Sequence, residues 1–182
     1  MASVAWMKIA RRIRVPLGFA FAALYLWLAA PTVASMLIGS ALIVPGLAIR
    51  ALASGHVQKN EQLTTTGPYA YTRNPLYLGS LVLAVGFALS ARNWWIGAGL
   101  ILIFLAIYLP VIHGEEISLG KQFPEFAEYA HQVPRLLPRL SSFKGGHGTF
   151  SKDLYWKHRE YNAALGSAAM LAALTAKLLW IG

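Results

Sequence analysis

The stretch Gly67-Pro68-Tyr69-Ala70-Tyr71-Thr72-Arg73-Asn74-Pro75-Leu76-Tyr77-Leu78-Gly79 separates long apolar runs with polar, proline-containing sequence. Each proline lacks an amide hydrogen and disfavours helical geometry in the residue before it, so no continuous helix is expected through the stretch. Asn74 and Pro75 predict a helix start, with Asn74 as cap and Pro75 at the first position. Arg73 is therefore expected just before a helix, at the edge of an apolar run. We expect this polar stretch to contain the functional site.

The composition is that of a membrane protein. The 182 residues are 57% hydrophobic and 13% charged, which is about half the charged fraction of a soluble domain. The net charge of +9 comes from basic residues that flank apolar runs. Such flanks are typical of contacts with anionic headgroups, so no nucleic-acid partner is expected. The chain has no cysteine, which excludes disulfides, cysteine metal sites and a thiol nucleophile.

The apolar runs predict an all-α, multi-span helical bundle with about five transmembrane helices, in a single membrane domain over residues 1–182. The first run also resembles a secretory signal, but a second apolar run follows at once and favours an uncleaved first span. Polar segments at about 56–77 and 113–139 are expected outside the bilayer. The predicted spans are residues 15–30, 32–52, 75–91, 94–112 and 161–181.

Charged residues are distributed unevenly between the two ends of these spans. With a cytoplasmic amino terminus, fourteen of the sixteen basic residues lie on the cytoplasmic side, leaving Arg92 and Lys177 on the other, as the positive-inside rule requires. All seven acidic residues and all five histidines fall on that same side, which the rule does not require. We therefore expect one membrane face to carry the chemistry.

Two acidic residues, Glu115 and Glu116, follow the predicted end of the fourth span. Negative charge at a helix carboxyl terminus opposes the helix dipole, which favours a functional role; the alternative is a helix stop that pairs with nearby cations. Arg73 has its own alternative, an anchor on lipid phosphate. The short turn at Arg92-Asn93 makes the third and fourth spans antiparallel neighbours, so Arg73 and both acids are expected at one membrane surface.

Motifs of several other enzyme classes do not occur in the sequence. The histidines have no metal-binding spacing, so no metal site is expected. There is no Gly-x-Ser-x-Gly elbow, no P-loop and no Gly-x-Gly-x-x-Gly fingerprint, which removes the usual support for hydrolases and soluble nucleotide-binding folds.

A joint pattern resembles a known family, the integral-membrane methyltransferases related to isoprenylcysteine carboxyl methyltransferase and to phosphatidylethanolamine, or phospholipid, methyltransferase. The resemblance covers about Lys59 to Arg139 and continues more weakly into the last span. Two positions depart from it, since Asn74 replaces a common histidine and Pro124 a usual glycine. The residues that carry the pattern are Thr66-Gly67-Pro68-Tyr69, Arg73-Asn74-Pro75-Leu76-Tyr77-Leu78-Gly79, Glu115-Glu116, Phe126, Tyr129, Val133-Pro134-Arg135 and Pro138.

The resemblance implies an S-adenosyl-L-methionine cofactor at the cytoplasmic face, bound by the segments at about 56–77 and 113–139 and roofed by the polar carboxyl-terminal segment. Arg73 and Glu116 would act in catalysis. Leu63 and the Val133-Pro134-Arg135 turn would cover the adenine, while the acidic pair would accept hydrogen bonds from ribose hydroxyls or the ammonium group. The residues implied to bind the cofactor are Leu63, Gly67, Pro68, Tyr69, Arg73, Asn74, Pro75, Tyr77, Glu115, Glu116, Pro134 and Arg135.

The expected methyl acceptor is a lipid or lipophilic small molecule that enters from the inner leaflet. Methyl transfer from a sulfonium is a direct displacement, which mainly requires positioning and exclusion of water. A carboxylate acceptor could be oriented by Arg73, and an amine could lose its proton to Glu115, Glu116 or a histidine. A carboxylate, an amine and a thiol all stay open as acceptors.

Two other classes compete with a methyltransferase. An NADPH-dependent membrane reductase resembling the sterol reductases would need more basic residues around its phosphates. A non-catalytic small membrane protein or transporter would place polar residues inside the spans, where this chain has almost none. The chain lacks the extra length of the larger eukaryotic relatives, so a prokaryotic inner membrane is the expected location. A homo-oligomer stays open.

Overall fold

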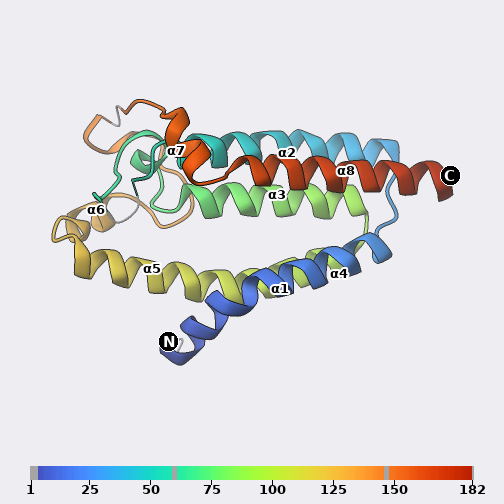
Figure 1. Cartoon of the computed structure of the whole chain (residues 1–182), viewed down its shortest axis with the longest axis horizontal. Helices are drawn as coiled ribbons and strands as arrows, with labels where there is room; N and C mark the ends of the chain where they lie inside the picture. Colours follow the sequence, from blue (N-terminus) through green and yellow to red (C-terminus); the bar gives the residue numbers. More distant parts are fainter. Residues whose placement is uncertain (1–3, 59–60, 146–147, 182) are drawn as a thin grey trace. The chain divides into compact units, whose positions relative to one another are not determined.

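The structure is a computed structural model that describes residues 4–58, 61–145 and 148–181; Lys59, where the resemblance begins, is not among them. The described residues form helices joined by turns and loops, with no strand, so the predicted all-α class is confirmed. In chain order (Figure 1) the elements are α1 (Val4–Leu28), α2 (Val33–Ser54), η1 (Gly67–Ala70), α3 (Pro75–Ala91), α4 (Trp94–Ile103), η2 (Phe104–Tyr108), α5 (Leu109–Gln122), α6 (Phe126–Gln132), η3 (Phe143–Gly145), α7 (Lys152–Lys157) and α8 (Tyr161–Ile181).

The helices include membrane-spanning candidates, as the composition predicts. Among the described residues, three are long and apolar enough to cross a bilayer: Val33–Ser54, Trp94–Gln122 and Tyr161–Trp180. Two shorter apolar helices cover Val15–Leu28 and Pro75–Ala91. The protein is therefore a helical membrane protein, and five crossings stay a prediction.

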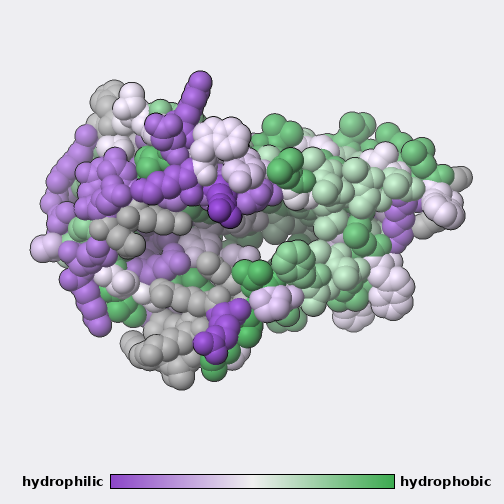
Figure 2. All heavy atoms as spheres, viewed as in Figure 1, coloured by the Kyte–Doolittle hydropathy of each residue, from purple (hydrophilic) through white to green (hydrophobic). Residues whose placement is uncertain are grey.

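The chain divides into two compact units. Unit 1 comprises residues 1–43, 84–116 and 167–182, and unit 2 comprises residues 44–83 and 117–166. Hydrophilic side chains gather over the segments around α6 and α7, which belong to unit 2 (Figure 2). Unit 1 holds most of the apolar helical residues, whereas unit 2 holds the proline-containing stretch.

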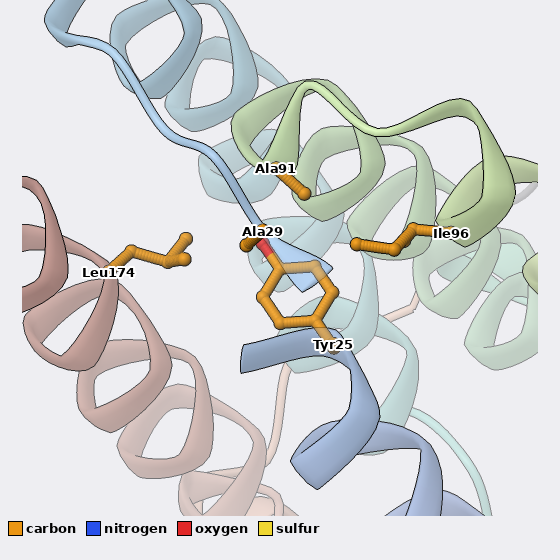
Figure 3. Close-up of a cluster of buried hydrophobic side chains, with 5 residues drawn as sticks. All are labelled: Tyr25, Ala29, Ala91, Ile96 and Leu174. Carbon is orange, nitrogen blue, oxygen red and sulfur yellow. The ribbon is translucent and has the colours of Figure 1, made fainter. Parts of the chain in front are cut away.

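The core of unit 1 joins the ends of several helices. Tyr25, Ala29, Ala91, Ile96 and Leu174 are almost fully buried and point toward one another (Figure 3). The hydroxyl of Tyr25 donates a 2.9 Å hydrogen bond to the carbonyl oxygen of Phe87. A phenol in an apolar core needs such a partner, so this bond lets the tyrosine fill the core.

The predicted turn between α3 and α4 is confirmed, and it is held by α1. Arg92 takes a left-handed backbone conformation with φ 51°. The Asn93 side chain caps α4 by accepting from the amide of Trp95, and its amide group donates to the carbonyl oxygen of Leu28 at 3.0 Å. Asn93 thus supplies hydrogen-bond partners for an amide at the start of α4 and for a carbonyl at the end of α1, because such groups have no partner within their own helix.

Lys177 binds the same end of α1. Its ammonium group donates to the carbonyl oxygens of Leu26 and Trp27 at 2.6 and 2.9 Å. A cation at a helix carboxyl terminus stabilises the helix dipole and satisfies its unpaired carbonyls.

The fourth apolar helix does not end at Ile112, contrary to the expectation from sequence. Helical structure runs from Trp94 through η2 to Gln122, and therefore includes Glu115 and Glu116. Glutamate is a good helix former and does not itself stop a helix. The helix ends where Pro124 follows, because proline cannot continue it.

Pro110 explains a widened turn inside this helix. η2 is a π-helical turn in which the amide of Leu109 bonds to the carbonyl oxygen of Phe104. The ring of a proline clashes with the carbonyl four residues before it and offers no amide hydrogen. That carbonyl belongs to Ala106, and the indole Nε1 of Trp6 donates to it at 3.0 Å. α1 thus supplies the hydrogen bond that Pro110 removes.

Glycines allow α2 and α3 to approach closely within each unit. In unit 1, a Cβ added at Gly86 would lie 2.8 Å from the carbonyl oxygen of Gly39. In unit 2, a Cβ added at Gly79 would lie 2.9 Å from the carbonyl oxygen of Gly46. Real Cβ atoms do not approach backbone this closely, so glycine is required at these contacts.

Candidate functional site

Residues 67–79, called the proline stretch below, begin with a short 3-10 turn and continue into α3. Pro75 is the first residue of α3, as the sequence predicts, and the structure shows that it is buried. Gly67 has φ +56°, and an added Cβ there would overlap the imidazole of His56. Glycine is therefore needed both for the backbone conformation and for the space.

The proline stretch is paired by backbone hydrogen bonds with residues 133–139, called the arginine turn below. The amide nitrogen of Arg73 donates to the carbonyl oxygen of Pro134 at 2.9 Å. The amide nitrogen of Arg139 donates to the carbonyl oxygen of Tyr71 at 3.0 Å. The two segments are distant in sequence, but these bonds fix them side by side.

Two polar side chains of the proline stretch strengthen this pairing. Thr72 is 2% exposed, and its hydroxyl lies 3.3 and 3.0 Å from the carbonyl oxygens of Arg135 and Leu136. The side-chain amide of Asn74 donates to the same Arg135 carbonyl at 2.9 Å. These side-chain hydrogen bonds add to the backbone pairing, so Thr72 and Asn74 help to make the loop pair rigid.

An apolar cluster supports the pair from α6. The cluster contains Ala70, Phe126, Tyr129, Val133 and Phe143 as buried residues. The hydroxyl of Tyr129 donates to the carbonyl oxygen of Tyr69 at 2.7 Å. Leu63, predicted to cover adenine, packs against this cluster while partly buried.

The structure brings together several of the residues predicted to bind a cofactor. Arg73 and Asn74 lie next to Pro134 and Arg135 through the hydrogen bonds described above. Arg73 is half-buried with a buried Nε atom, whereas Arg135 is exposed. The other predicted residues of unit 2 are Gly67, Pro68 and Tyr69 in η1, and Pro75 and Tyr77 at the start of α3.

Glu115 and Glu116 lie on α5, in the part of the helix that belongs to unit 1. Glu116 is 6% exposed, and Glu115 is half-buried. Because Arg73 belongs to unit 2, its proximity to these acids stays a prediction. The argument from a helix terminus no longer applies, since α5 continues past both residues to Gln122.

Sequence reasoning missed an ion pair that joins the elements around the proline stretch. Arg50 of α2 binds Glu160 through two hydrogen bonds, from Nε at 2.6 Å and from Nη2 at 3.0 Å. Its Nη1 also donates to Ser80 and to the carbonyl oxygen of Leu76 in α3. Bidentate pairs of this kind fix orientation. Arg50 lies near the end of the predicted span 32–52 and Glu160 directly precedes the predicted span 161–181, and no spacing rule connects them.

Two histidines connect the end of α2 to the segment that contains α7. The His56 ring nitrogens lie 2.7 Å from the Leu52 carbonyl oxygen and 3.3 Å from that of Gly148. His158 Nδ1 lies 3.0 Å from the carbonyl oxygen of Ser54. Among the residues that the structure describes, no group of three or more histidine, aspartate or glutamate side chains could hold a metal ion.

The family model for phospholipid methyltransferases matches residues 17–125. This match covers more than half of the chain, including the whole proline stretch and both acids of α5. The protein therefore belongs to the phospholipid methyltransferase family.

Two curated relatives share about two fifths of their aligned residues with this chain. The cobalt-zinc-cadmium resistance protein CzcN of Cupriavidus metallidurans is 41% identical over 88 residues, which are 48% of this chain and 41% of the relative. The nickel-cobalt-cadmium resistance protein NccN of Alcaligenes xylosoxydans xylosoxydans is 40% identical over 87 residues, again 48% of this chain and 41% of the relative. The alignment thus spans less than half of either relative. No solved structure matches the chain.

Proposed function

We propose that the protein is an S-adenosyl-L-methionine-dependent methyltransferase that acts on a lipid-like acceptor at the cytoplasmic membrane face. The observation that carries the proposal is the hydrogen-bonded pairing of the proline stretch with the arginine turn, which holds Arg73 at the start of α3. Membership of the phospholipid methyltransferase family supports the same reaction class.

The donor set of the paired loops fits the anionic end of this cofactor. Arg73 supplies a guanidinium group immediately before α3, whose amino terminus also attracts negative charge. The half-buried position limits competition from water, and the backbone bond to Pro134 fixes the arginine in place. A carboxylate is the group that such a site recognises best.

Other residues would hold the remaining parts of the cofactor. Leu63 and the Pro134-Arg135 peptide would cover the adenine ring, and Gly67 to Tyr69 would form the loop against the ribose side. Glu115 and Glu116 would accept hydrogen bonds from hydroxyl or ammonium donors, since carboxylates are strong acceptors. When bound, the cofactor would supply a methyl group on a positively charged sulfur.

The protein's own contribution would be positional. A direct displacement requires donor and acceptor in line, and positioning of this kind is worth roughly 7 to 11 kcal/mol in the best cases. The rigid pairing of two loops through Thr72, Asn74 and Arg139 is suited to that task. An amine acceptor would need to lose a proton, for which Glu116 is the proposed base.

The acceptor is proposed to be a membrane lipid or a lipophilic small molecule. The helices of a membrane protein give such a molecule direct access, and the family description names phospholipids. The names of the two relatives refer to metal resistance, but no described cluster of ligating side chains favours metal binding as a second function here.

Two measurements test the proposal on the purified, detergent-solubilised protein. Calorimetric titration with S-adenosylhomocysteine is expected to show binding that Arg73→Ala abolishes and Arg73→Lys weakens, because lysine lacks the bidentate geometry. Incubation with cofactor carrying a labelled methyl group and a lipid extract is expected to label one lipid class. Absence of both binding and label, together with binding of NADPH, would instead identify a reductase.

A further inference from the structure

Two of the most exposed apolar side chains in unit 2 lie within the arginine turn and directly after it. Leu137 is 76% exposed and Leu140 is 103% exposed. We call this pair the leucine tip. Neither residue belongs to a helix or to a membrane-spanning candidate, and both would face water if the turn were only a soluble loop. Two strongly exposed leucines three residues apart in a loop indicate a surface that another apolar medium covers.

The leucine tip is held rigidly. Arg139, which lies between the two leucines, is fixed by its backbone bond to Tyr71 and by side-chain bonds from its guanidinium to the Gln132 carbonyl at 3.0 Å and the Ser141 hydroxyl at 2.9 Å. Pro138 fixes one further backbone angle. A preorganised tip loses little conformational freedom when it binds, which favours binding.

Positive charge surrounds the leucine tip. Arg135 is exposed beside it, and Arg139 lies within it. The acceptors of the Arg139 guanidinium described above are a carbonyl and a hydroxyl, both neutral, so these bonds do not cancel its charge. Apolar side chains flanked by arginines are the combination that enters the headgroup region of an anionic bilayer.

We propose that the leucine tip inserts into the headgroup region of an anionic phospholipid bilayer, with Arg135 and Arg139 beside lipid phosphates. Charge complementarity favours this occupant, because the chain carries a net charge of +9 and a second copy would bring like charges together. The protein already resides in a membrane, so the bilayer is the apolar medium within reach. This inference does not depend on the methyl transfer proposed above.

The absence of cysteine from the sequence makes a direct test simple. Single variants Leu137→Cys and Leu140→Cys are labelled with an environment-sensitive fluorophore and reconstituted into nanodiscs of phosphatidylglycerol or of phosphatidylcholine. Glu125→Cys serves as the control, because Glu125 is an exposed acidic residue of the same unit. Unchanged thermal unfolding of each variant shows that the label has not disturbed the fold.

Insertion predicts emission at shorter wavelength for both leucine positions in phosphatidylglycerol, together with quenching by lipids that carry a quencher near the headgroup. The shift and the quenching are expected to be smaller in phosphatidylcholine and absent for Glu125→Cys. Emission from both leucine positions that matches the aqueous control in phosphatidylglycerol overturns the proposal. A shift that grows with protein concentration in detergent also overturns it, in favour of contact between two copies.

Discussion

The amide nitrogen of Arg73 donates a 2.9 Å hydrogen bond to the carbonyl oxygen of Pro134. This bond fixes the backbone of the arginine without using its guanidinium group. The side chain thus extends from an anchored position at the start of α3. An anchored backbone with a cationic side chain is a suitable arrangement for holding a small anionic group.

Thr72→Val is expected to destabilise unit 2. The substitution keeps the shape of the buried side chain but removes the hydroxyl that lies near the Arg135 and Leu136 carbonyl oxygens. The loss of such a buried hydrogen bond costs about 1 to 3 kcal/mol. The destabilisation would be measured as a lower unfolding temperature and as faster amide exchange in residues 133–139. Thr72→Ser retains the hydroxyl and is the matched control; equal losses in both variants would contradict the assigned role.

Breaking the pair between Arg50 and Glu160 is expected to cost more than breaking a surface pair. The two side chains are 23% and 10% exposed, and an unpaired buried charge costs about 3 to 5 kcal/mol. Glu160→Gln should therefore lower the unfolding temperature strongly. The double variant Arg50→Met with Glu160→Met should recover part of the loss, because it removes both charges.

The control for that experiment is the exposed pair Lys144 and Glu128, whose side chains are 64% and 54% exposed. Glu128→Gln should change the free energy of unfolding by about 1 kcal/mol or less. Unfolding midpoints that coincide for Glu160→Gln and Glu128→Gln would show that the Arg50 network contributes no more than a surface ion pair.

Gly79→Ala is expected to separate α2 from α3 in unit 2. The new Cβ would lie 2.6 Å from Cγ of Arg50 and 2.9 Å from the Gly46 carbonyl oxygen. Overpacking of this kind typically costs about 1 to 3 kcal/mol. Gly97→Ala is the control, because nothing lies within 4 Å of an added Cβ there, and it should stabilise α4 by about 0.5 to 1 kcal/mol. If Gly97→Ala unfolded at a lower temperature than Gly79→Ala, the packing argument would be refuted.

Glu116→Ala is expected to abolish binding of S-adenosylhomocysteine if the acid belongs to the cofactor site. Glu116 is buried, whereas the control Lys144 is exposed, so Lys144→Ala should bind normally. Glu116→Gln should retain partial binding, because the amide still offers an acceptor oxygen. Calorimetry on correctly folded variants decides the matter; undiminished binding by Glu116→Ala would remove Glu116 from the site.

The proline stretch shows how far the sequence could predict this structure. The helix start at Pro75 and the turn at Arg92-Asn93 follow from local rules that act within a few residues, and both were predicted correctly. The apolar runs likewise predicted helices of a membrane protein. These features depend on backbone sterics and hydropathy, which single residues encode directly.

Features that depend on partners distant in sequence were not predictable in the same way. The bonds from Thr72 to the arginine turn and the pairing of Arg50 with Glu160 require the fold before they can be identified. The predicted end of the fourth helix, at residue 112, was wrong. The charged residues that follow were taken as a helix stop, although glutamate favours helices. Pro124 was the better signal for that end.

The π-helical turn of η2 determines the direction of one side chain. An α-helix rotates by about 100° per residue, and a π turn accommodates one extra residue. Wound as an uninterrupted α-helix, the same residues would give Glu115 the direction that Glu116 now has. Glu116 is the buried acid of the two. The choice between two chemically identical neighbours is thus made by Pro110, a residue that itself has no acid–base chemistry.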